Sequence, residues 1–164
     1  MFEIADIVKA LLQLSDLSVA EFERACVARA WAISKPMQGL VEAAASYPVI
    51  LDTIIAPPLV LCPFWSVEDY PRAQWRERLR ASFEQALREV VADFREPDDR
   101  GEWGRGAWAF AGWLGGAVVV SVEETNYEDA RVPFLVLACS SRDSEKQIPG
   151  GLTARCFSGL DDAD

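Results

Sequence analysis

The spacing of apolar residues changes period once along this 164-residue chain, and that change limits the fold classes open to it. From Trp75 to Phe94 apolar side chains recur every three or four residues, which predicts an amphipathic helix over 71–94. Pro71 suits its first turn, where a missing N–H costs no hydrogen bond. After an acidic, turn-rich loop at 96–102 the pattern becomes that of β-branched and aromatic strands. Strands are predicted over 107–114, 117–123, 132–139 and, more briefly, 152–157.

Turn residues punctuate this second half. Gly115-Gly116 separates the first two predicted strands and suits a two-residue hairpin turn. Pro133 stands at the start of the third strand and predicts an edge position or a bulge, because proline cannot donate to a central ladder.

The N-terminal half is predicted to be helical. Short amphipathic spacing indicates a helix over 2–14, and Ser18 with Glu21 forms a capping box for a helix reaching Ile33. A weaker helix is predicted over 37–46. The segment 48–65 contains four prolines and one charge, so we expect a buried irregular segment or two short pieces, at 49–55 and 59–61.

Helices followed by strands, without β-α-β alternation, predict an α+β fold. We expect N-terminal helices and one long amphipathic helix packed on a small antiparallel β-meander. The chain length fits a single domain over 1–164, with 158–164 as a frayed acidic tail.

Composition excludes several chemistries. There is no histidine, which removes His-based nucleophile systems and His-containing metal sites. No phosphate-binding or dinucleotide-binding glycine motif is present, so we expect neither a cofactor nor a metal. The formal net charge of −10 disfavours nucleic acid as a partner. The four cysteines form no C-x-x-C pair and are expected to be buried or half-buried thiols in a reducing compartment.

A cytoplasmic location is expected because two acids precede the first base, Lys9, which is unlike a secretory signal. The longest uncharged apolar run, 106–122, carries four glycines and is interpreted as a hairpin, so no membrane partner is predicted.

Two acidic clusters are the candidate partner-binding residues. The first comprises Asp98, Asp99 and Glu102 beside Trp103, and the second lies in a predicted loop and comprises Glu123, Glu124, Tyr127, Glu128 and Asp129. Carboxylates beside an aromatic suit recognition of a basic protein. The competing interpretations are solvated loops, with Trp103 simply closing the hairpin end. The carboxylate spacing does not match a calcium-binding loop.

The aromatic residues of the predicted hairpin lie on both of its faces. Trp108 and Phe110 share one face of their predicted strand and Trp113 points to the other, so at least one face exposes an aromatic residue unless something covers it. The N-terminal helices, a homodimer mate or another protein could each provide that cover.

These features predict an acidic protein-binding module rather than an enzyme. Such a module would be an inhibitor or immunity-type protein that masks a basic partner, or an effector chaperone. The alternative is a small-molecule-binding or enzymatic domain with its pocket between 48–65 and the Trp-rich hairpin 103–124. The first hypothesis requires the acids of 123–129 to be accessible.

Overall fold

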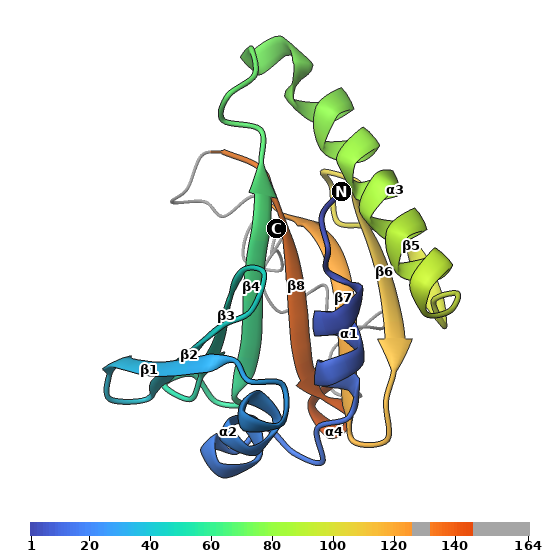
Figure 1. Ribbon diagram of the computed structural model, residues 1–164. Coiled ribbons are helices and arrows are strands. Elements are labelled where there is room, and N and C mark those ends of the chain that lie inside the picture. The colour runs from blue at the N-terminus through green and yellow to red at the C-terminus, as the bar shows by residue number, and fades with distance from the viewer. Residues whose placement is uncertain (126–131, 146–164) are drawn as a thin grey trace.

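A computed structural model, described over residues 1–125 and 132–145, contains an eight-stranded antiparallel sheet with the three longer helices packed on one face (Figure 1). The helices are α1 (Ala5–Leu12), α2 (Val19–Ala28), the 3-10 turn η1 (Arg72–Gln74), α3 (Trp75–Asp93) and α4 (Arg142–Glu145). The strands are β1 (Ala32–Met37), β2 (Leu40–Ala44), β3 (Pro48–Asp52), β4 (Leu59–Ser66), β5 (Asp99–Trp103), β6 (Trp108–Leu114), β7 (Val118–Thr125) and β8 (Phe134–Ser141).

The sheet joins two meanders. Its strand order is β1-β2-β3-β4-β8-β7-β6-β5, so β1–β4 and β5–β8 each follow the chain, and the pairing of β4 with β8 connects them. The helix α3 links the two meanders and packs against β7, β6 and β8. The expected α+β class, with helices on an antiparallel meander, is confirmed.

Local periodicity predicted α3 correctly. Its apolar stripe is buried against the sheet and comprises Leu79, Phe83, Ala86, Leu87 and Val90. The helix α1 joins the same core, which also contains the fully buried Trp113. The run 106–122 forms the hairpin β6–β7 as predicted, and no helix within the described residues is long and apolar enough to cross a membrane.

The predicted helices between 29 and 46 are wrong. The second helix ends at Ala28, Ala30 adopts a left-handed φ of 57°, and the chain continues as β1 and β2. Burial in β2 alternates with period two, Val41 and Ala43 being buried while their neighbours are more accessible. Pairing with β3 therefore outweighs the helix propensity of this alanine-rich segment.

Two other segments form strands: the first was expected to be a buried irregular segment or two short pieces, and the second a loop. Residues 48–65 form β3 and most of β4, with Pro63 at a register irregularity. Part of the predicted loop 96–102 belongs to β5. Pro133 marks neither an edge nor a bulge, because it precedes β8, which lies between β4 and β7 at the sheet centre. The predicted strand 152–157 and tail 158–164 lie outside the described residues.

Gly115 and Gly116 lie at the β6–β7 connection as predicted, but neither adopts a left-handed φ. A Cβ added to Gly115 would lie 2.7 Å from the carbonyl oxygen of Leu12, whereas one on Gly116 would meet nothing within 4 Å. The absence of a side chain at Gly115 therefore lets the β6–β7 hairpin approach the end of α1.

We expect Gly115→Ala to lower the free energy of unfolding by about 1–3 kcal/mol, because the added methyl overpacks against a backbone atom. Gly116→Ala is the matched control and should change it by less than about 0.5 kcal/mol. Urea unfolding followed by circular dichroism measures both. Equal effects would contradict the assigned contact.

Candidate functional site

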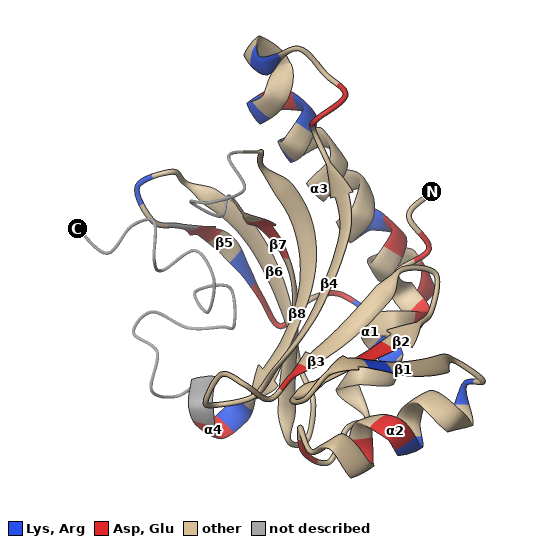
Figure 2. Ribbon diagram, turned by 90° about the vertical axis from the view of Figure 1, so that its left-hand side faces the viewer, with Lys and Arg blue, Asp and Glu red and all other residues tan. Residues whose placement is uncertain are grey.

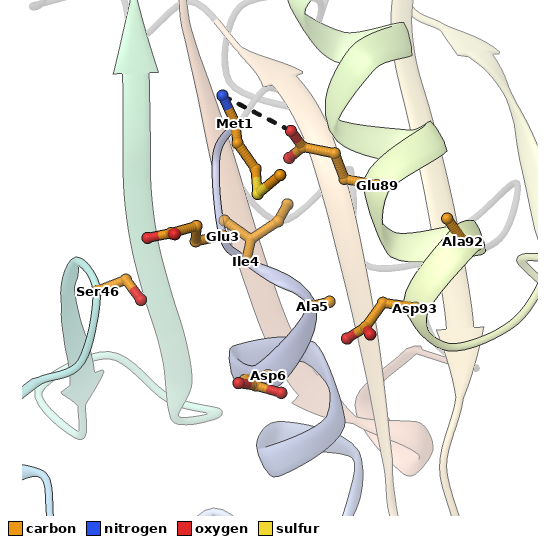
Figure 3. A pocket seen from close by; sticks show the side chains of 9 residues that line it. All are labelled: Met1, Glu3, Ile4, Ala5, Asp6, Ser46, Glu89, Ala92 and Asp93. Atoms are coloured by element: carbon orange, nitrogen blue, oxygen red, sulfur yellow. Dashed lines mark ion pairs between the residues drawn. The ribbon is translucent and has the colours of Figure 1, made fainter.

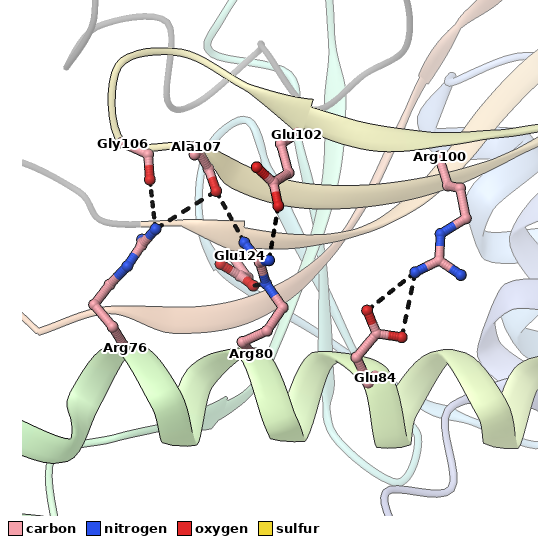
Figure 4. Close-up of polar contacts among 8 residues, drawn as sticks. All are labelled: Arg76, Arg80, Glu84, Arg100, Glu102, Gly106, Ala107 and Glu124. Atoms are coloured by element: carbon pink, nitrogen blue, oxygen red, sulfur yellow. Dashed lines mark hydrogen bonds and ion pairs between the residues drawn. The ribbon is translucent and has the colours of Figure 1, made fainter.

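Arg80 binds acids from both predicted clusters (Figure 4). It projects from α3 toward the sheet, where Nη1 lies 2.8 Å from Glu102 of β5 and Nε pairs with Glu124 of β7. Its Nη2 also donates to the carbonyl of Ala107 at 2.9 Å. Glu124 is 1% exposed, so this ion pair belongs to the interior. The two acidic clusters do meet in space, but around an arginine of the same chain.

Asp98 has a structural role as well. Its Oδ2 accepts hydrogen bonds from the Leu114 N–H at 2.7 Å and from Arg95 Nη1 at 2.9 Å. Burial alone would raise the pKa of Asp98, but these two donors outweigh it and hold that pKa below its ordinary value. The carboxylate therefore fixes the start of β5 against the end of β6.

The remaining predicted site residues differ in position and in exposure to solvent. Asp99 is exposed at the start of β5, and Trp103 ends that strand opposite Trp108. Glu123 is 1% exposed on the sheet face opposite α3, where it accepts a hydrogen bond from the Ser121 hydroxyl at 3.0 Å. Tyr127, Glu128 and Asp129 lie outside the described residues. The predicted solvated loop is thus wrong for Glu123 and Glu124, which continue β7.

Several arginines at the start of α3 contact aromatic rings. The Arg76 guanidinium lies 4.2 Å from the ring centre of Trp108, and that of Arg78 lies 4.7 Å from Tyr70. Arg76 also donates to the carbonyl of Gly106, so the basic residues of α3 hold the 104–107 turn in place.

The described cysteines are poor nucleophiles. Cys26, Cys62 and Cys139 are free and buried, as predicted, and Cys156 lies outside the described residues. Burial raises the pKa of Cys26 to about 11 and of Cys62 to about 12, and it raises that of Cys139 further. Within the described part of the chain, no three metal-ligating side chains gather.

An acidic hollow of about 620 Å³ lies between α1 and α3 (Figure 3). Its carboxylates are largely engaged by nearby groups. Glu89 accepts from the Phe2 N–H at 2.8 Å and lies 3.9 Å from the terminal amine of Met1, while Lys9 pairs with Asp6 and Asp93. These contacts anchor the start of the chain to α3.

A more accessible surface lies on the first meander. Cross-strand pairing aligns Glu42 with Ile50 and Ile50 with Leu61, and directly opposed residues point to the same side of a sheet. The alternating residues Val41, Ala43, Val49 and Leu51 are buried toward the helices, so this row faces away from them. We term it the β1–β4 outer face and define it by the half-buried or exposed residues Ser34, Leu40, Glu42, Ala44, Ile50, Asp52 and Leu61. Leu59, which pairs with Asp52 on the same side, is buried.

The β1–β4 outer face is apolar with acidic charge only. Its members are half-buried or exposed, and Glu42 and Asp52 are its only charged residues. Charged residues elsewhere concentrate on α2, α3 and β5 (Figure 2). Met37, Ile54 and Ile55 are exposed at or beside the two turns that end this meander, and the Thr53 N–H donates to the Gly39 carbonyl and joins those turns.

The free edge of β1 is less suited to pairing with another strand. It contains Lys35 and Pro36, and its register with β2 is irregular between Ser34 and Met37. Lysine, proline and irregular register are common protections of edge strands. The face of this meander, rather than its edge, is therefore the candidate contact surface.

An aromatic groove of about 530 Å³ adjoins this face where β3 begins and β4 continues, and its lining includes Tyr47, Phe64, Trp65 and Phe134. It differs from the pocket expected between 48–65 and the hairpin 103–124, since β8 separates β4 from β7 within the sheet.

Comparison of the chain with family models, curated proteins and solved structures finds no match.

Proposed function

We propose that this protein is a protein-binding module whose β1–β4 outer face receives a basic, partly apolar segment of another protein. The observation that supports this most is the composition of that face. Half-buried Ile50 lies opposite Glu42 and two residues before Asp52, half-buried Leu61 lies on the other side of Ile50, and there is no lysine or arginine among the members named.

This composition suits a protein interface. Interfaces combine an apolar centre, which supplies most of the binding free energy, with a polar rim. Carboxylates at the rim increase the rate of association with a cationic surface and select against acidic partners. The net charge of −10 acts in the same direction at longer range.

Of the two types of partner-masking protein considered, the chaperone type is favoured. An inhibitor acting through the acidic clusters needs accessible carboxylates, but Glu123 and Glu124 are buried and Glu102 is paired with Arg80. A chaperone needs an accessible apolar surface for an incompletely folded segment, which the β1–β4 outer face supplies.

Self-association through this face is disfavoured by charge. A two-fold dimer brings the same patch of both copies together. It would therefore place Glu42 and Asp52 near their own copies without compensating cations from this face. Sedimentation of the purified protein measures this alternative directly.

The test compares two charge reversals, Glu42→Lys on the β1–β4 outer face and Glu77→Lys on the exposed surface of α3. Both alter net charge identically. We expect Glu42→Lys to reduce capture of basic partners from a lysate of the source cell about tenfold or more, because it removes an attraction and adds a repulsion. Glu77→Lys should retain capture, and wild-type capture should weaken at moderate salt.

Circular dichroism melting of both variants controls for folding. Equal loss of capture in both would show that only net charge matters. Undiminished capture by a folded Glu42→Lys variant would contradict the proposed face.

A further inference from the structure

The aromatic groove beside the β1–β4 outer face has an open side formed by unequal strand lengths. β3 begins at Pro48, and its pairing with β4 covers only Leu59 to Leu61, whereas β4 continues to Ser66. The rings of Tyr47, Trp65 and Phe134, which line the groove, are half-buried and reach solvent at this place.

The groove is aromatic, and the charge among its described lining residues is acidic. Glu68 is exposed and is the only charged residue among those that the structure describes there. Burial, followed by Glu3, Cys62 and Glu89, raises the pKa of Tyr47, so two carboxylates act on this ring. Arg78 lies over Tyr70, whose ring neighbours that of Trp65 in the groove.

The ring network already holds one guanidinium. Tyr47 lies 6.0 Å from Phe64, Trp65 lies 6.1 Å from Tyr70, and Arg78 stacks on Tyr70 at 4.7 Å. Aromatic faces attract cations, and arginine is favoured over lysine because its planar, weakly hydrated guanidinium stacks on a ring while it pairs with a carboxylate.

We propose that this groove binds an arginine side chain of the partner segment, with the guanidinium against the aromatic rings and paired with Glu68. This inference rests on the proposed function and names the side chain that anchors the partner. Pro63 lines the groove and follows Leu61 of the β1–β4 outer face by two residues on β4, so strand alternation places both on the same side and one extended segment can contact both surfaces.

The experiment uses the full chain and three capped nonapeptides in which leucine alternates with arginine, citrulline or glutamate. Citrulline retains the shape of arginine without its charge. Calorimetry gives each Kd, and the indole N–H resonance of Trp65 reports on the groove, with that of the fully buried Trp113 as internal reference. We expect the arginine peptide to bind about tenfold more tightly than the citrulline peptide and to shift the Trp65 resonance.

Glu68→Gln should remove most of that difference, whereas the matched control Glu77→Gln on α3 should preserve it. Trp65→Leu should weaken the arginine peptide, with folding checked by melting. Equal binding of arginine and citrulline peptides, an unchanged Kd in Glu68→Gln, or no peptide binding at all would overturn the assignment. If Ile50→Lys abolishes peptide binding and Glu68→Gln has no effect, peptide binding at the β1–β4 outer face is supported and only the assignment of the groove as an arginine site fails.

Discussion

Replacing Arg80 by methionine is expected to lower the free energy of unfolding by about 3 kcal/mol, the lower end of the range for breaking a buried ion pair. The reason lies mainly in Glu124, which is 1% exposed and would lose the guanidinium that neutralises it. The lower end applies because the Arg80 side chain is itself 35% exposed. Urea unfolding at pH 7 measures the change.

A second substitution separates charge from packing in this prediction. In the Arg80→Met background, Glu124→Gln removes the unpaired charge and should recover at least about 1 kcal/mol. Arg88→Met, on an exposed position of the same helix, should cost less than about 0.5 kcal/mol. If Arg80→Met and Arg88→Met proved equally mild, the assigned interior ion pair would be wrong.

Trp113→Ala is expected to cost about 3–5 kcal/mol, as for other truncations of large core side chains. Trp113 is fully buried in the main core, and its indole N–H donates to the Arg95 carbonyl at 3.1 Å. The substitution leaves a cavity between the sheet and the helices and removes a hydrogen-bond donor.

The midpoint of urea unfolding measures this loss. Trp113→Phe should cost less, because it keeps most of the apolar volume and loses the donor. Trp75→Ala provides a comparison at a half-buried ring and should also cost less. A Trp113→Ala variant within about 1 kcal/mol of wild type would contradict the core position.

The elements that could be predicted from sequence are those whose period is visible locally. The apolar stripe from Trp75 to Val90 lies on a single helix, so the spacing of residues close together in the chain is sufficient to predict it. Residues 32–44 could not be assigned in this way. Their alanines favour a helix, and only pairing with β3, made later in the chain, turns them into strands.

The candidate site could be predicted only in part for the same reason. Charge alone indicated a loop at 123–129, yet Glu124 keeps the alternation of Val118, Val120 and Val122 and therefore points to the helices. That alternation was the signal that could have placed it. The β1–β4 outer face depends on the register of four strands, which local spacing does not encode.

The most direct test of the protein-binding account places a photo-crosslinking amino acid at Ile50 of the β1–β4 outer face, with Gln85 on the exposed surface of α3 as control. After irradiation in the source cell, cross-linked peptides are identified by mass spectrometry. The account predicts one dominant adduct from position 50, to an arginine-containing, partly apolar segment of another protein, and none from position 85. The same adducts from both positions, or none from position 50, would contradict it.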